Sequence, residues 1–291
     1  QLGAPWRGSL TRTASLIGAS AAMVIGVVVL LLSGPQWRTA ALCALVTAGV
    51  ALLAGTVLSR AGSDSGAGGI VAATGLPYAF VGGLLLLAEE GSLSLVGPAQ
   101  LLVGSTVLLM VSVMGFLAVA DRLWLFTAGA LLAVHGVLGA LLAFSPIDAS
   151  GASAMVICTA LLLLPMAAVL SVRLAGMPLP DLPQTAQELM ADRPLPPRDQ
   201  VTAAVIRADE IFAGLLLGAA LTSVAAGALL LREGVAAQLL AGIVAVLLVV
   251  RSRSLVRPRH RAPLLVFGGL GAVVVPAALA LDQPADVRPL L

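Results

Sequence analysis

Few side chains in this 291-residue sequence could take part in chemistry, and they do not gather into a known motif. His135 lies near the middle of one apolar run, and Cys43 and Cys158 lie in two others. A functional histidine at that depth needs a charged partner, and no apolar run offers an acidic one. We therefore expect a neutral His135 bonded to a backbone carbonyl or hydroxyl of a neighbouring helix. Both cysteines are expected to be buried small hydrophobic residues.

The motifs that usually carry catalysis are missing from the sequence. It contains no phosphate-binding loop, no HExxH, no CxxC and no pair of carboxylates within an apolar run. We therefore predict no catalytic residue, no metal site and no cofactor, and the sequence gives no positive support for an enzyme.

Composition places the chain in a membrane. Hydrophobic residues make up 59% of it and charged residues only 10%, whereas a soluble domain carries about a quarter charged residues. All 16 basic residues are arginines, and they lie in turns between apolar runs. Nucleic acid is therefore not an expected partner.

The apolar runs have the length of membrane-spanning helices. A bilayer core of about 30 Å needs about 20 apolar helical residues, and the runs lack the alternation of barrel strands. We predict an all-α polytopic membrane protein with about nine transmembrane helices. The predicted spans are 14–33, 39–59, 69–88, 98–119, 123–144, 152–174, 211–231, 235–250 and 263–281.

The arginines predict the orientation of these spans, because arginine is enriched on the cytoplasmic side. With the N-terminus in the cytoplasm, only Arg38, Arg232 and Arg288 lie outside. The predicted cytoplasmic arginines are Arg7, Arg12, Arg60, Arg122, Arg173, Arg193, Arg198, Arg207, Arg251, Arg253, Arg257, Arg259 and Arg261. The chain is therefore expected to be a multi-pass protein of the plasma (inner) membrane with a cytoplasmic N-terminus.

One polar, proline-rich insert, residues 176–210, interrupts the apolar sequence between spans six and seven. Connections of this length usually have a function. Thr185 and Glu188 have the spacing of a helix-capping box, and Pro194, Pro196 and Pro197 favour extended backbone. From Asp199 the pattern is helical and is expected to run unbroken into span seven. We interpret the insert as a semi-rigid cytoplasmic arm, with a flexible tether as the alternative.

The insert also defines the predicted organisation of the chain. This organisation comprises a cytoplasmic N-terminal segment (1–13), a membrane block of six helices (14–175), the cytoplasmic proline-rich loop and helical stalk (176–210), a block of three helices (211–281) and an extracytoplasmic tail (282–291).

Three further patterns concern packing. Gly214 and Gly218 are four residues apart in span seven, which predicts a close helix–helix contact. Pro77, Pro165 and Pro276 lie within spans and are expected to kink them, and Tyr78 is interpreted as a packing residue with one hydrogen bond. Trp6, Trp37 and Trp124 flank spans and are expected to anchor them at the headgroups.

The insert resembles one protein family. Residues 179–189 (LPDLPQTAQEL), 194–198 (PLPPR) and 207–210 (RADE) are similar to the EccD family, multi-span membrane components of actinobacterial and mycobacterial type VII (ESX) secretion systems. The resemblance implies dimers that enclose a lipid-filled space, and assembly with EccB, EccE and the FtsK-like ATPase EccC. It also implies a ubiquitin-like domain and eleven spans. This sequence has neither, which we attribute to a chain trimmed at both ends.

The leading hypothesis is therefore a non-catalytic scaffold of a type VII secretion complex. It would form a dimeric transmembrane wall in membrane lipid and dock the ATPase and other subunits through its loop. The alternative is a secondary transporter or permease that uses His135 and the kinked helices, and a lipid-handling enzyme is a weaker third. The expected docking residues are Pro180, Pro183, Thr185, Glu188, Leu189, Pro194, Pro196, Pro197, Arg198, Arg207, Asp209 and Glu210.

Overall fold

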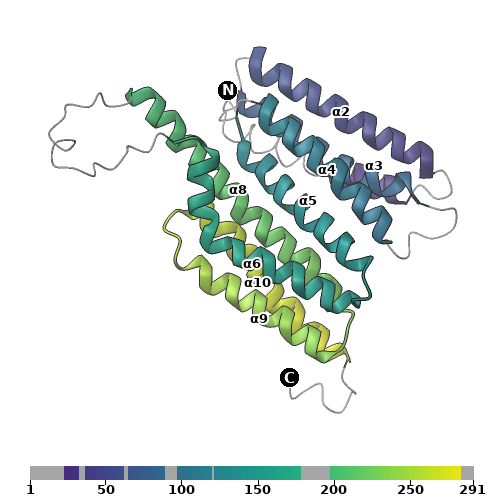
Figure 1. Cartoon of the computed structure of the whole chain (residues 1–291). Helices are drawn as coiled ribbons and strands as arrows, with labels where there is room; N and C mark the ends of the chain where they lie inside the picture. Colours follow the sequence, from purple (N-terminus) through teal and green to yellow (C-terminus); the bar gives the residue numbers. More distant parts are fainter. Residues whose placement is uncertain are drawn as a thin grey trace, which may run out of the picture. The chain divides into compact units, whose positions relative to one another are not determined.

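The computed structural model describes residues 23–32, 37–61, 65–88, 97–119, 121–177 and 197–282, and all regular structure in these ranges is helical (Figure 1). Eight of its helices are long and apolar enough to cross a membrane. Residues 23–31 form a further helical segment. The eight helices are α2 (Trp37–Ala61), α3 (Ser65–Leu86), α4 (Pro98–Ala118), α5 (Leu123–Ala143), α6 (Ala149–Leu174), α8 (Arg198–Leu230), α9 (Val235–Ser252) and α10 (Pro258–Asp282).

The predicted fold class is confirmed, since each of spans two to nine corresponds to one of these helices. Most of span one lies outside the described residues. The predicted continuity of stalk and span seven is also confirmed, because α8 runs unbroken for 33 residues. At 1.5 Å per residue it is about 50 Å long, well beyond the roughly 30 Å of a bilayer core. One end of α8 must therefore project from the membrane.

Local sequence explains where several helices begin. Pro197, in extended conformation (φ −54°, ψ 136°), directly precedes α8, and Asp199 places a negative charge in its first turn, where the helix dipole favours it. Pro98 begins α4 and Pro258 begins α10. Proline suits this first position, because the N–H group that it lacks would have no helical partner there.

The helices form two compact units, residues 1–122 and residues 123–291. The predicted membrane blocks were divided at the insert instead. The second unit contains α5 and α6 from before the insert together with α8, α9 and α10 from after it, because α8 packs against both α5 and α6.

In the first unit, α3 packs against α2 on one side and α4 on the other. The contact between α2 and α3 is close because small residues line it. A Cβ atom added to Gly55 would lie 2.4 Å from the backbone nitrogen of Ala72, and one added to Gly68 would lie 2.4 Å from that of Ser59. Small residues at four-residue spacing let helix backbones approach in this way.

Arg60 connects α2 to the end of α4. Its Nε donates a hydrogen bond to the carbonyl of Ala118 at 2.7 Å, and its Nη2 donates to that of Leu117 at 3.2 Å. The last carbonyls of a helix have no partners within it. The Arg60 guanidinium therefore satisfies α4 and places the C-terminal ends of α2 and α4 together.

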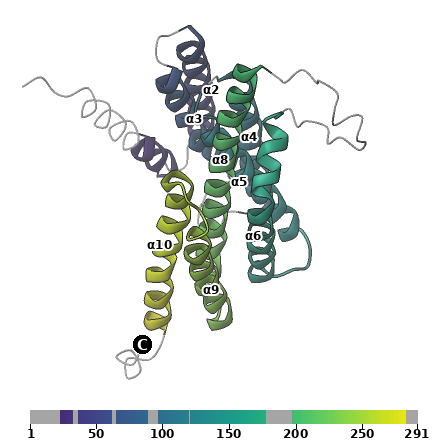
Figure 2. The same ribbon diagram turned by 90° about the vertical axis from the view of Figure 1, so that its left-hand side faces the viewer.

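In the second unit, α8 is the central helix. It contacts α5, α6, α9 and α10, and its span is the most buried of the eight. Figure 2 shows α8 between the α5–α6 pair and the α9–α10 pair. The residues that position the candidate site therefore lie on α8 and on the ends of its neighbours.

Two predictions about packing are corrected. Cys43 and Cys158 are exposed on the helix surfaces rather than buried, because the outer face of a membrane helix is as apolar as its inner face. Trp37 begins α2 and was predicted to anchor the span at the headgroups, but its side chain is buried in a cluster that includes Val81 and Leu85.

Other predicted residues have the following places. Trp6 lies outside the described residues, and Pro77, Pro165 and Pro276 lie within α3, α6 and α10. Their kinks remain predictions. Tyr78 packs tightly, since a Cβ atom on Gly26 would lie 2.0 Å from its hydroxyl oxygen.

Candidate functional site

Asp209 and Glu210, called the acidic pair below, mark the point where α8 changes character. Most side chains before the pair are exposed, whereas Ile211 directly after it is fully buried. The pair is itself mostly sheltered, with side-chain exposures of 23% and 13%. Two carboxylates in such a place require compensating charge or hydrogen bonds.

The compensation comes from residues 251–261, called the arginine turn, which connect α9 to α10 and contain five arginines. Arg257 forms an ion pair with Asp209 through Nη1 and Oδ1. Arg259 lies between both carboxylates, 3.1 Å from Oε1 of Glu210 and 3.9 Å from Oδ2 of Asp209. The beginning of α10 is therefore bound to α8.

Glu210 also reaches a third helix. Its Oε2 accepts a hydrogen bond of 2.7 Å from the backbone N–H of Leu123, the first residue of α5. A carboxylate at this place satisfies a free N–H and is favoured by the helix dipole. The guanidinium of Arg259 lies 5.7 Å from the ring centroid of Trp124, within the range of a cation–π contact. We call this meeting of α5, α8 and α10 the three-helix joint.

His260 completes the joint. Its ring is almost fully buried and meets the ring of Phe212 edge-on, with centroids 4.9 Å apart. Its Nε2 lies 3.3 Å from Oδ1 of Asp209, but the orientation does not make a hydrogen bond. His260 therefore contributes packing to the joint.

The interactions of the joint connect helices to one another. Both carboxylates face guanidinium groups, and these interactions hold three helix ends together. An ion pair between partly exposed groups contributes at most about 1 kcal/mol. The several contacts of Glu210 and Arg259 form a network, which adds geometric precision. The joint consequently fixes the direction in which the first part of α8 leaves the bundle.

The structure places the predicted docking residues in three groups. Pro180, Pro183, Thr185, Glu188, Leu189, Pro194 and Pro196 lie outside the described residues. Pro197, Arg198 and Arg207 are exposed at or near the beginning of α8. Asp209 and Glu210, in contrast, face α10 and α5 of the same chain.

The partners of the acidic pair were not among the predicted site residues. Arg257 and Arg259 were predicted only as markers of the cytoplasmic side, and no role was predicted for His260 or Leu123. Five arginines within 11 residues, and two adjacent acids at the start of span seven, were the available indications. Which arginine meets which acid could not be read from them.

The predicted contact glycines lie against α5. A Cβ atom on Gly214 would lie 2.5 Å from the carbonyl oxygen of Trp124, and one on Gly218 would lie 2.9 Å from Cβ of Leu131. Both glycines therefore let α8 approach α5 directly below the joint.

His135 does not form the predicted contact with a neighbouring helix. Its buried ring places Nδ1 2.9 Å from the carbonyl oxygen of Leu131, one turn earlier on its own helix. A carbonyl four residues back is within reach of any helical side chain of this length, so no second helix is needed. Within the described part of the chain, no group of three metal-binding side chains is present.

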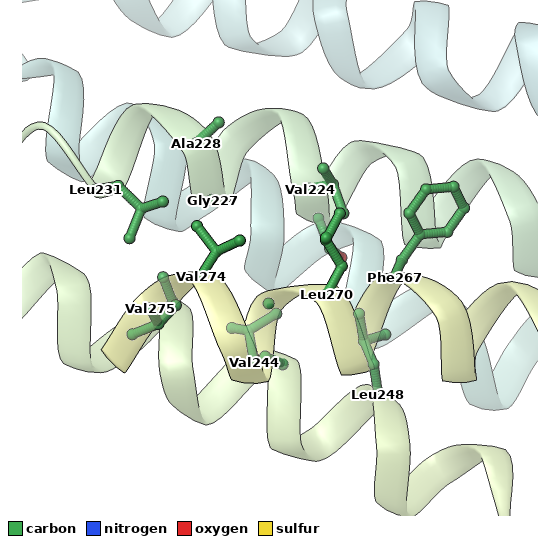
Figure 3. Close-up of a pocket in the computed structure, with 14 residues that line it drawn as sticks. Val224, Gly227, Ala228, Leu231, Val244, Leu248, Phe267, Leu270, Val274 and Val275 are labelled. Atoms are coloured by element: carbon green, nitrogen blue, oxygen red, sulfur yellow. The ribbon is translucent and has the colours of Figure 1, made fainter. Parts of the chain in front are cut away.

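A small apolar cavity of about 90 Å³ lies between α8, α9 and α10 (Figure 3). Its lining includes Val224, Leu248, Phe267 and Leu270. The hydroxyl of Ser223, the one polar side chain in the lining, donates to the carbonyl of Ala219 at 2.8 Å. The cavity offers no converging polar groups of the kind that orient a substrate.

Comparison with known proteins identifies the family. A family profile described as EccD-like transmembrane domain matches residues 11–291. No curated protein sequence matches the chain significantly.

Two solved structures have a similar fold. One is protomer 1 of the ESX-3 core complex, with a TM-score of 0.75 and 18% identity over 99% of this chain and 65% of that chain. The other is the MycP5-free ESX-5 inner membrane complex in State II, with a TM-score of 0.68 and 20% identity over 99% of this chain and 70% of that one. The chain thus spans about two thirds of their length. It belongs to the EccD family, the multi-span membrane components of type VII (ESX) secretion systems.

Proposed function

We propose that this chain is a non-catalytic membrane scaffold of a type VII secretion complex, and that α8 carries its cytoplasmic docking arm. Family membership supports the secretion complex. The three-helix joint is the observation that supports the scaffold role, because Asp209 and Glu210 connect α8 to the ends of two other helices. A rigid base is what an arm needs if it is to hold partner subunits at a fixed place.

The arm itself begins with the first three turns of α8. Val205 and Ile206 are exposed there, with 45% and 61% of their surface accessible. The acidic pair, which follows three residues later, is sheltered. Exposed apolar side chains beside the charged Arg198 and Arg207 suit a protein partner. We propose that this surface and the preceding proline-rich residues bind the FtsK-like ATPase and its neighbours, EccB-type and EccE-type subunits.

The arrangement in the membrane follows from the charges. The joint, Arg173 and the arginine turn belong to the helix ends predicted to be cytoplasmic. We propose a chain in the inner membrane with its N-terminus and the residue 176–210 insert in the cytoplasm.

The proposed dimeric wall needs an apolar outer face. One open groove of about 630 Å³ runs between α9 and α10, lined by Leu239, Ile243, Val246, Leu247 and other apolar residues. Such a surface is suited to acyl chains or to a second copy of the chain, and we propose that both contact this face in the assembled wall.

Replacing residues 180–196 by a Gly/Ser segment of equal length tests the docking role while leaving α8 intact. The ATPase subunit should co-purify with the wild-type chain in detergent and be lost, at least tenfold, from the variant. A matched control substitutes Ser145 and Ile147, in the turn between α5 and α6 at the opposite helix ends, and should retain the ATPase. Unchanged ATPase recovery from the loop variant would exclude docking through the insert.

A further inference from the structure

The arginine turn contains more arginines than the carboxylates of the joint pair with. Arg257 and Arg259 face the acidic pair. Arg251, Arg253 and Arg261 are exposed, and the described residues place no carboxylate within ion-pair distance of any of them. Three exposed guanidinium groups without a carboxylate partner among the described residues therefore lie within 11 residues, at the ends of two membrane-spanning helices.

The same turn exposes an apolar tip. Val256 is 96% exposed, the highest value among the described large hydrophobic side chains, and it stands between Arg253 and Arg257. A short turn of arginines around a single exposed valine is tolerated in bulk water. It is favourable at the boundary of headgroups and acyl chains, where apolar atoms enter the lipid and cations stay at its surface.

The position of the turn supports the same setting. α9 ends at Ser252 and α10 begins at Pro258, and both helices are long and apolar enough to span the bilayer. The residues between them must lie near the membrane surface. Guanidinium groups bind phosphate through paired N–H donors, and clustered arginines at this depth attract anionic lipid.

We propose that the arginine turn binds the phosphate headgroups of anionic phospholipids through Arg251, Arg253 and Arg261, with Val256 reaching the acyl boundary. Arg257 and Arg259 stay with the acidic pair and hold the turn against α8. The bound lipid thereby ties the base of the docking arm to the membrane. This inference goes beyond the proposed scaffold, since lipid binding does not depend on partner subunits.

Native mass spectrometry of the full chain in neutral detergent tests this proposal. Phosphatidylglycerol and phosphatidylcholine with identical acyl chains are titrated separately, and each lipid-binding constant is measured. The wild-type chain should bind phosphatidylglycerol at least tenfold more tightly. Each arginine near the surface contributes about fivefold in affinity, so Arg251→Gln/Arg253→Gln/Arg261→Gln should abolish the preference.

The control variant Arg38→Gln/Arg173→Gln/Arg232→Gln removes three exposed arginines from other helix ends. It should retain the preference for phosphatidylglycerol. Thermal unfolding without added lipid should be the same for both triple variants, which separates lost binding from misfolding. The proposal is overturned if the wild-type chain shows no preference, if the arginine-turn variant keeps it, or if both variants lose it equally.

Two further measurements address the source of the phosphate and the role of Val256. Inorganic phosphate, at matched ionic strength, should displace phosphatidylglycerol poorly because it has no acyl chain. Displacement as effective as that by soluble short-chain phosphatidylglycerol would contradict the lipid assignment. Val256→Asp should weaken phosphatidylglycerol binding severalfold, whereas Val256→Leu should preserve it. Equal binding by these two variants would remove Val256 from the site.

Discussion

Single residues of α8 show how this chain combines close packing with charge. Gly214 brings the helix backbone against the carbonyl of Trp124, and Glu210, one turn earlier, accepts the N–H of Leu123. Both residues act on the first turn of α5. The absence of a side chain at one position and a carboxylate at the other together set the distance between the two helices.

Gly214→Ala should therefore destabilise the chain, because its Cβ would lie 2.5 Å from a backbone oxygen that cannot rotate away. We expect a loss of about 1–3 kcal/mol, typical of overpacking, measured as a lower midpoint of thermal unfolding in one detergent. Gly227→Ala on the same helix is the control, since no atom lies within 4 Å of its Cβ position. Alanine favours helix over glycine, so this variant should be equal to wild type or more stable. The reverse order would contradict the close α5–α8 contact.

The acidic pair should contribute stability that depends on salt. Asp209→Asn/Glu210→Gln removes both charges and should cost about 1–2 kcal/mol, between the values for exposed and buried ion pairs, because Arg257 and Arg259 remain 65% and 43% exposed. High salt screens the wild-type pairs, so the difference should narrow as salt is raised. Asp199→Asn, in the exposed first turn of α8, should change thermal stability by less than about 0.5 kcal/mol. A double variant as stable as this control at low salt would refute the joint.

At the scale of helices, the first unit depends on how closely α2 and α3 approach. Gly55, Gly68, Gly75 and Gly82 face the partner helix across this contact, each with atoms of that helix within 3 Å of an added Cβ. Gly68, Gly75 and Gly82 recur every seven residues on α3, which keeps them on one face of that helix. Only Gly214 and Gly218 of span seven were predicted as contact glycines, and this row was not identified, because glycine and alanine are abundant throughout the chain.

Gly68→Leu should separate α2 from α3, since even a Cβ atom would lie 2.4 Å from the Ser59 backbone nitrogen. Gly49→Leu places the same side chain on the open face of α2, where no atom lies within 4 Å. We expect strong destabilisation, above about 2 kcal/mol, for the first variant and little change for the second. Thermal unfolding in detergent distinguishes them, and similar midpoints would show that the helix contact is looser than described.

At the scale of the whole molecule, charge and hydropathy together decide which helix ends share a side of the membrane. If each described helix crosses the membrane once, alternation along the sequence puts Arg60, Arg173 and the arginine turn on one side of the membrane. Arg38 and Arg232 are then on the other side. Cytoplasmic enrichment of arginine then predicts which side is which.

Single cysteines test this orientation. In a Cys43→Ser/Cys158→Ser background, Ser254→Cys in the arginine turn should react with a membrane-impermeant maleimide in inverted vesicles only. Ser145→Cys, between α5 and α6, should react in right-side-out vesicles only. Detergent-permeabilised vesicles, in which both should react, give the reference labelling. The opposite pattern would place the insert outside the cell and refute docking to a cytoplasmic ATPase.

The sequence by itself determined the class of this protein, the positions of eight described spans and the continuity of the stalk with span seven. These features follow from local properties, namely apolar length, proline placement and helical pattern. The amino-acid sequence of the insert also resembled the EccD family, and the profile match over residues 11–291 confirms that family.

The tertiary structure alone decided which side chains meet. Asp209 and Glu210 lie 47 or more residues from Arg257 and Arg259, and Glu210 lies 87 residues from Leu123. Each of these side chains had several arginines or helix ends as possible partners. The exposure of Cys43 and the burial of Trp37 were equally undetermined, because hydropathy does not distinguish a lipid-facing position from a packed one. Packing of α8 against α5 and α10 makes that choice. It places Asp209 and Glu210, two adjacent acids of the predicted docking loop, in contacts with other helices of the same chain.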